Sequence, residues 1–235
     1  MTPCDLLSMR EHPNLPMIDL MADQLGNKEL LQFLQTIRNW VGGIPTGQTE
    51  KHDKTSSEIF KYVDKCPTRS GWNRYTGKVY RGLYKIGDIF RSKVVTDGLR
   101  VVRSKTAVGD QAVLICKYQY ESSIKAQSWT RTYHTGYDFS QSRFNRMDRD
   151  NVGFILEKTI GANDGLRMDW LGGLKHEDEI IVRVKSETLR CIVPLYDYSR
   201  NSIRRTMNKP AWAYVPEDIA KLIPTGSWPG SSGSL

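Results

Sequence analysis

Apolar side chains recur with a helical period in the N-terminal part of the chain. Between residues 15 and 41 they stand among polar positions at Leu20, Leu25, Leu30, Leu31, Leu34, Ile37 and Trp40. This period predicts amphipathic helices. Asp19 or Asp23 is expected to cap a first helix, and Asn27, which follows Gly26, a second one.

The helical pattern ends at residues 42–45, Gly-Gly-Ile-Pro, which are typical of a helix stop. Residues 45–56 are polar and have no apolar period, so we expect a linker or exposed loop there, followed by a short helix at 58–63. No internal repeat is evident. The expected division is a helical N-terminal region (1–70), a main domain (71–224) and a flexible tail rich in Gly and Ser (225–235).

From Gly77 onward the pattern changes to short runs rich in β-branched and aromatic residues, which predict strands. The predicted strands are 78–84, 99–102, 112–118, 123–132, 152–158, the run that begins at Glu177, and 189–195. Residues 133–150 are expected to form a loop or irregular helix, and 161–173 a series of turns. Short strands with few long helices between them favour an α+β fold with antiparallel or mixed sheets over a doubly wound one.

Composition and charge narrow the function classes. The net charge of +8 favours encounters with nucleic acid or acidic partners, although the basic groups are short and a solvated surface explains them somewhat better than a dedicated nucleic-acid face does. No apolar run reaches the length of a transmembrane helix, and the N-terminus lacks the layout of a signal peptide. The densest basic groups are Arg143, Arg146 and Arg149, and Arg200, Arg204 and Arg205.

The cysteines and histidines indicate neither a metal site nor a disulfide framework. Cys4, Cys66, Cys116 and Cys191 are far apart, without a C-x-x-C pair, so we expect a reduced, cytosolic protein. The four histidines lack ligand spacing. Neither a Walker loop nor a G-x-G-x-x-G motif is present, which excludes the usual phosphate-binding loops.

Glu177 and Glu179 stand two residues apart at the start of the predicted strand, so their carboxylates are expected on one face, roughly 6–7 Å apart, while Asp178 looks away. One carboxylate of such a pair can orient a sugar while the other assists a nucleophile. Glycosyl transfer uses carboxylates in this way, because its transition state is an oxocarbenium cation. The alternative interpretation is an acidic turn without a chemical role.

Three short motifs follow one another, each beside a predicted strand: Tyr80-Arg81-Gly82, Ser128-Trp129-Thr130 and Glu177-Asp178-Glu179. In this order they resemble the mono-ADP-ribosyltransferase family of the arginine–serine–glutamate class. The resemblance covers residues 77–195, and 161–176 resembles the loop that presents the target in that family. It implies split sheets that form an NAD cleft.

The resemblance implies a role for each motif residue. Glu179 would stabilise the ribosyl cation, and Glu177 would remove a proton from an arginine acceptor. Arg81 would clamp the diphosphate of NAD, and Gly82 would let the backbone approach the nicotinamide amide. The ordinary alternatives are a cross-strand ion pair for Arg81 and a β-bulge for Gly82.

Further roles complete the expected site. Ser128 would orient Glu179, and Thr130 would line the pocket beside it. Trp129 is interpreted as packing, and Tyr80 as core. One aromatic side chain should stack on nicotinamide, and the sequence leaves the choice open among Tyr133, Tyr137 and Phe139. Trp170 is the candidate for target contact, with a buried anchor as the alternative.

The favoured hypothesis is therefore an enzyme that transfers ADP-ribose from NAD to arginine side chains, with no metal, acting in the cytoplasm in the manner of phage or bacterial effectors. An exposed arginine on a ribosomal or transcription-associated protein is the expected acceptor, and RNA-linked NAD is a second conceivable donor. The alternatives are an NAD glycohydrolase on the same fold and a basic nucleic-acid-binding protein in which the motifs are coincidental.

Overall fold

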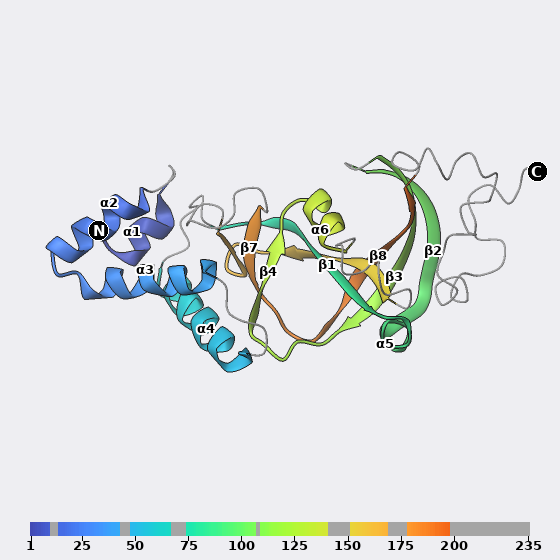
Figure 1. The fold of residues 1–235 in the computed structure, drawn as a ribbon, viewed down its shortest axis with the longest axis horizontal. Helices are drawn as coiled ribbons and strands as arrows, with labels where there is room; N and C mark the ends of the chain where they lie inside the picture. Colours follow the sequence, from blue (N-terminus) through green and yellow to red (C-terminus); the bar gives the residue numbers. More distant parts are fainter. Residues whose placement is uncertain are drawn as a thin grey trace, which may run out of the picture. The chain divides into compact units, whose positions relative to one another are not determined.

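The computed structural model is α+β and consists of two compact units that interleave along the chain (Figure 1). The first unit contains residues 1–79, 121–131 and 159–185, and the second contains 80–120, 132–158 and 186–235. Strands within each unit pair antiparallel, which confirms the predicted fold class at this level. The structure describes residues 1–9, 14–42, 48–66, 74–106, 109–140, 151–168 and 178–197.

Four helices open the first unit: α1 (Pro3–Ser8), α2 (Leu15–Gln24), α3 (Lys28–Val41) and α4 (Thr49–Lys65). Asn27 caps α3 as predicted, through its side-chain bond to the N–H of Leu30. The prediction that Asp19 or Asp23 caps α2 is wrong. Asn14 caps it instead, because the helix begins earlier, with a proline in its first turn.

Helix α4 occupies much of the stretch that was expected to be a loop. The prediction for residues 45–56 is wrong from Thr49 onward, and the short helix predicted at 58–63 is the end of a longer one. Two of its buried positions are the polar residues Thr55 and Ser56. Ser56 bonds its own helix, from Oγ to the carbonyl of Asp53 at 3.1 Å. Buried hydroxyls of this kind conceal the apolar period that marks a helix.

The sheet of the first unit has three described strands: β4 (Ala126–Thr130), β7 (Glu179–Arg183) and β6 (Gly165–Arg167). β7 lies between the other two, side by side with β4 in Figure 1. Ala126, Leu166 and Ile181 join the buried cluster of the helices, so this sheet face packs against the helical layer. β6 falls in the stretch that was expected to contain only turns.

The second unit carries a sheet in the order β2-β3-β8-β5. Strand β1 begins in the first unit and continues in the second. Phe90, Tyr118 and Phe154 pack against one another in the core of the second unit, with ring centroids 4.9–5.7 Å apart. The elements are β1 (Gly77–Ile86), α5 (Gly87–Lys93), β2 (Val94–Thr106), β3 (Gly109–Tyr120), α6 (Tyr133–Ser140), β5 (Asn151–Ile160) and β8 (Glu187–Asp197).

Two of the four cysteines form a disulfide, so the expectation of a fully reduced chain is wrong for this pair. Cys4 in α1 and Cys66 after α4 are bonded, with their Cα atoms 5.2 Å apart and a sequence separation of 62. Packing of the helices brings the pair together, which their sequence spacing does not indicate. Cys116 and Cys191 are free thiols, buried and directly opposite each other on β3 and β8.

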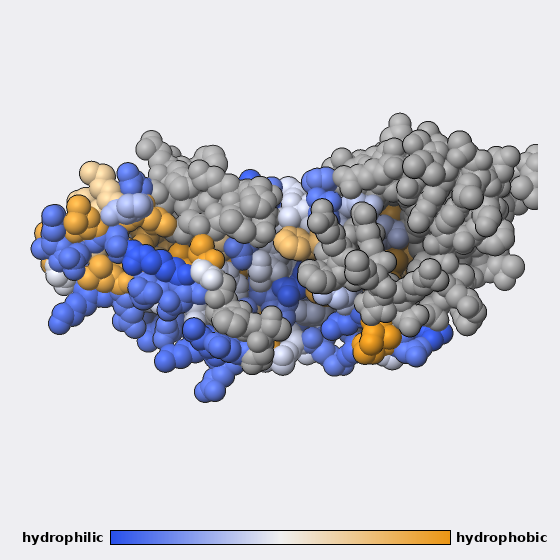
Figure 2. All heavy atoms as spheres, in the orientation of Figure 1, coloured by the Kyte–Doolittle hydropathy of each residue, from blue (hydrophilic) through white to orange (hydrophobic). Residues whose placement is uncertain are grey.

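Apolar side chains are also exposed on α2 and at its C-cap, Leu25. Met17, Leu20, Met21 and Leu25 all point into solvent, and Figure 2 shows hydrophobic side chains gathered over the N-terminal helices. None of the helices in the described part of the chain is long and apolar enough to cross a membrane.

Candidate functional site

The first two sequence motifs lie on strands, and the third reaches a strand at its last residue. Tyr80, Arg81 and Gly82 belong to β1, Ser128 and Thr130 belong to β4, and β7 begins at Glu179. Glu177 and Trp170 lie outside the described residues. The structure therefore brings together Ser128, Thr130 and Glu179 in the first unit, while Arg81 and Gly82 belong to the second unit.

Thr130 is the residue directly opposite Glu179. The pairing of β4 with β7 sets Thr130 against Glu179 and Ser128 against Ile181. Paired residues of an antiparallel ladder point to the same face, with their Cβ atoms about 4.5–5.5 Å apart. Thr130 is buried, at 4% exposure, whereas Ser128 is exposed and two pairs further along the strand. Thr130 is therefore nearer to Glu179 than Ser128, to which the sequence assigned the orienting role.

Glu179 is held by a residue from the N-terminal helices. The indole Nε1–H of Trp40, in α3, donates to Oε1 of Glu179 at 3.1 Å. Trp40 is buried, and its ring packs edge-to-face on His52 of α4, with centroids 4.6 Å apart. Helices α3 and α4 thus hold the Trp40 indole in place, and the indole in turn orients the carboxylate of Glu179. Sequence reasoning assigned Trp40 only to the apolar face of a helix, and nothing in the pattern marked it as a donor.

Asp178, the residue just before β7, is held in place by Arg131. Arg131, which follows β4, donates from Nε to Oδ1 of Asp178 at 2.8 Å, and its backbone N–H bonds the carbonyl of Asp178 at 3.2 Å. Asp178 adopts a φ of 48°, a left-handed conformation that aspartate tolerates better than most residues. The carbonyl of Glu179 accepts from the N–H of Met168 at 2.9 Å. Backbone and side chains together fix the turn into Glu179.

Gly82 is required by packing within the second unit. A Cβ atom at this position would lie 2.0 Å from the carbonyl oxygen of Gly136 and 2.6 Å from the backbone nitrogen of Ser140, both in α6. Real Cβ atoms do not approach backbone so closely. The space that the sequence interpretation reserved for a ligand beside Gly82 therefore holds the backbone of α6.

Arg81 is partly buried in the second unit. Burial lowers the pKa of its guanidinium, and the nearby Tyr120 acts in the opposite direction. A guanidinium stays protonated at ordinary pH even so. Removal of part of its hydration makes an anionic partner more favourable.

The aromatic residues that could stack on nicotinamide differ in their exposure to solvent. Tyr137 is buried, at 7%, and Phe139 is 48% exposed, both on α6. Tyr133 packs edge-to-face against Tyr80, with centroids 5.9 Å apart. Trp129 is buried at 2% exposure, which confirms its interpretation as a packing residue.

Within the described residues, no three His, Cys, Asp or Glu side chains cluster closely enough to hold a metal ion. Comparison of the chain with protein-family models, curated proteins and solved structures found no match. The candidate site consequently stands on its own geometry: a carboxylate at a strand start, a threonine opposite it, and an indole donor from the helical layer.

Proposed function

We propose that the chain is an NAD-dependent mono-ADP-ribosyltransferase that moves ADP-ribose to arginine side chains and releases nicotinamide. The observation that carries the proposal is the environment of Glu179, which faces Thr130 across the strand pair and accepts the bond from Trp40. The order of the three motifs along β1, β4 and β7 adds support.

The chemistry requires a fixed carboxylate. As the bond between nicotinamide and ribose breaks, positive charge develops on the sugar, and an oriented carboxylate stabilises it without reorganisation. Trp40 holds Oε1 of Glu179. We assign the other oxygen, Oε2, to the ribose hydroxyl next to the reacting carbon. Trp40 is then a positioning residue, since it acts through Glu179.

Transfer to arginine requires a base as well. A guanidinium is protonated at ordinary pH and becomes a nucleophile only when a carboxylate accepts its proton. We assign this proton to Glu177, two residues before Glu179 in the sequence. Water as acceptor would give free ADP-ribose and turn the same centre into a glycohydrolase.

The proposal includes an NAD cleft of the kind found in split-sheet ADP-ribosyltransferases. Arg81 is assigned to the diphosphate, for which its partly desolvated guanidinium suits an anion. Ser128 and Thr130 are assigned to the wall beside Glu179. Tyr133, Tyr137 and Phe139 stay the candidates for nicotinamide stacking, and Phe139, at 48% exposure, has the most exposed ring of the three.

The proposed place of action is the cytoplasm, with an exposed arginine on a ribosomal or transcription-associated protein as acceptor. The Cys4–Cys66 disulfide is in tension with a reducing compartment, because cytosolic thiols are normally kept reduced. The redox state of this cysteine pair in the producing cell therefore tests whether the protein acts in a reducing compartment such as the cytoplasm.

The test is incubation with labelled NAD and a bacterial lysate, using the wild type, Glu179→Ala, Glu177→Gln and the exposed control Glu50→Gln. We expect label on lysate proteins with the wild type and the control only, and continued nicotinamide release by Glu177→Gln without protein labelling. A wild type that neither labels protein nor releases nicotinamide contradicts the proposal.

A further inference from the structure

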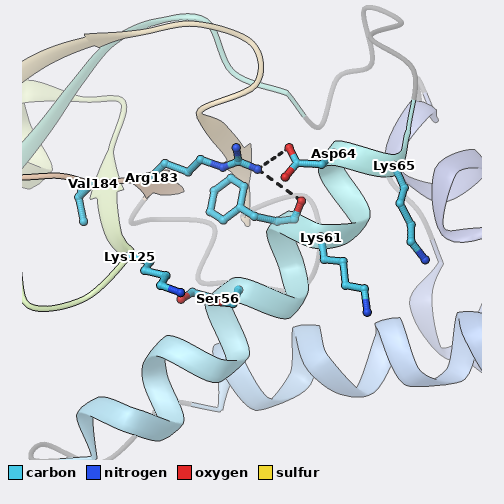
Figure 3. Close-up of a pocket in the computed structure, with 9 residues that line it drawn as sticks. Ser56, Lys61, Asp64, Lys65, Lys125, Arg183 and Val184 are labelled. Atoms are coloured by element: carbon cyan, nitrogen blue, oxygen red, sulfur yellow. Dashed lines mark hydrogen bonds and ion pairs between the residues drawn. The ribbon is translucent and has the colours of Figure 1, made fainter.

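A basic pocket lies in the first unit between α4 and the ends of two strands. Its volume is about 610 Å³, and its walls come from one face of α4, from Lys125 just before β4, and from Arg183 and Val184 at the end of β7. Figure 3 shows Lys125 extending toward Ser56 on the helix, and Arg183 lying over α4 beside Asp64. All lining residues belong to the same compact unit.

Hydrogen bonds join α4 to the strand ends and the two strand ends to each other. The N–H of Lys125 donates to Oδ1 of Asp53 in α4 at 2.8 Å, and the N–H of Val184 donates to the carbonyl of Lys125 at 2.9 Å. Arg183 spans the gap, because its Nη2 bonds Oδ1 of Asp64 at 2.5 Å and its guanidinium stacks 4.4 Å from the centre of the Phe60 ring. The recess is therefore formed before any ligand arrives, which lowers the entropic cost of binding.

The charge of the lining is strongly positive. Four cations and one carboxylate line the pocket, which gives four minus one, or +3: Lys61, Lys65, Lys125, Arg183 and Asp64. Arg183 already neutralises Asp64, and the ion pair of Lys65 with Glu29, at 3.7 Å, is exposed to solvent. Among the described residues, Lys61 and Lys125 have no ion-pair partner for their side chains. Unneutralised cations gathered around one recess favour an anionic ligand.

The other lining residues specify the kind of anion. Ser57 adds a hydroxyl one helical turn before Lys61, while Phe60 and Val184 supply apolar wall. A phosphate monoester carries close to two negative charges and several acceptor oxygens, so it can engage two ammonium groups and a hydroxyl together, while its organic part contacts the apolar wall. The volume falls within the range of pockets for small molecules, roughly 300–1,000 Å³.

A single recess distinguishes this pocket from a nucleic-acid surface. A chain of nucleotides needs cations that follow successive phosphates along a groove. Here Lys61, Lys125 and Arg183 all line one recess instead. We propose that this pocket binds a small phosphorylated organic molecule, about the size of a mononucleotide.

The proposed ligand site is separate from Glu179. In the antiparallel pair, Lys125 and Arg183 stand at one end of β4 and β7, and Thr130 and Glu179 at the other. Arg183 stands four positions after Glu179 along the strand, which corresponds to about 13 Å. Binding in the pocket therefore does not depend on the transferase proposal and can be tested alone.

The test uses the full chain, labelled with ¹⁵N, and AMP as the phosphate-monoester probe, with adenosine as the uncharged analogue. AMP is expected to shift the amide signals of Ser57, Lys125 and Val184, and adenosine to bind at least about tenfold more weakly. The double variant Lys61→Glu/Lys125→Glu should weaken AMP binding by at least about tenfold as well, because it removes two charged hydrogen bonds.

Lys54→Glu is the matched control, since Lys54 is an exposed lysine of α4 outside the pocket. It should leave AMP binding within about twofold of the wild type, with all variants checked for unchanged thermal unfolding. The proposal is overturned if AMP causes no shifts at these residues, if adenosine binds as tightly, or if the double variant behaves like the control. Binding of a single-stranded oligonucleotide without binding of AMP would overturn it too, in favour of a nucleic-acid surface.

Discussion

The indole nitrogen of Trp40 lies 3.1 Å from Oε1 of Glu179, although the sequence separation of the two residues is 139. The helices before residue 66 therefore contribute directly to the geometry of the proposed catalytic carboxylate. Without this donor the carboxylate could rotate about its side-chain torsions, and its charge would be less well aligned with the developing cation.

Trp40→Phe removes the donor and keeps an aromatic ring in its place. A hydrogen bond to a charged group contributes about 1.5–3 kcal/mol, so we expect kcat for nicotinamide release to fall roughly 10- to 100-fold with little change in KM for NAD. Thr36→Val is the control on the same helix, because it removes bonds to Gln32 and Glu58 and leaves Glu179 untouched. Equal kcat for Trp40→Phe and the wild type would show that the bond has no part in positioning Glu179.

Gly82→Ala should destabilise the chain because of the close approach of α6. The added Cβ would collide with the backbone of Gly136 and Ser140, at 2.0 and 2.6 Å. Overpacking of this kind costs about 1–3 kcal/mol, and backbone can yield less than a side chain. Chemical denaturation measures the loss. Gly161→Ala is the control, since its nearest contact would be an ordinary 3.7 Å to Asp164, and equal stability of the two variants would contradict the packing.

Reduction of the Cys4–Cys66 disulfide should lower the free energy of unfolding by about 2–4 kcal/mol, because the bond closes a long loop in the unfolded chain. Denaturation with and without dithiothreitol measures this, and the Cys4→Ser/Cys66→Ser variant should not respond to the reductant. Mass spectrometry of thiols trapped in the producing cell tests the compartment: a reduced pair agrees with cytoplasmic action, and a fully formed disulfide argues against it.

The thiols of Cys116 and Cys191 should be inert in the native protein. Burial and a hydrogen bond with Cys116 raise the pKa of the Cys191 thiol, and both side chains are closed to solvent. Because burial closes both side chains to solvent and the raised pKa keeps the thiolate of Cys191 scarce at pH 8, a thiol reagent should modify neither residue until the chain is denatured, when both should react. Fast labelling of either native thiol would contradict the buried cross-strand arrangement.

Local signals in the sequence predicted much of the fold. All seven predicted strands are present, and Asn27 was identified as a cap because the Gly26-Asn27 pair is a local signal. Helix α4 was missed over its first half because Thr55 and Ser56 place hydroxyls at buried positions, and β6 because it has only three residues. The positions of single strands and of the Asn27 cap could be predicted from the sequence. The first half of α4 could not, because polar residues at buried positions interrupt the helical period of apolar residues.

The residues of the candidate site could be predicted from the sequence only in part, for a different reason. Ser128, Thr130 and Glu179 could be chosen from short motifs, because each motif is local to one strand. Trp40 could not, since its role depends on how α3 packs against the start of β7, a contact between distant parts of the chain. The same holds for Arg131, whose partner Asp178 is 47 residues away. Packing between elements, which no local pattern encodes, decides these contacts.

The central claim is that Glu179 is the carboxylate that cleaves NAD, and nicotinamide release tests it most directly. Wild type, Glu179→Gln and Glu50→Gln would be incubated with NAD, and nicotinamide quantified by chromatography. We predict release by the wild type and by Glu50→Gln, and a loss of at least about a hundredfold in Glu179→Gln, whose neutral amide cannot stabilise the ribosyl cation. Release by Glu179→Gln at the wild-type rate, or none from the folded wild type, would contradict the account.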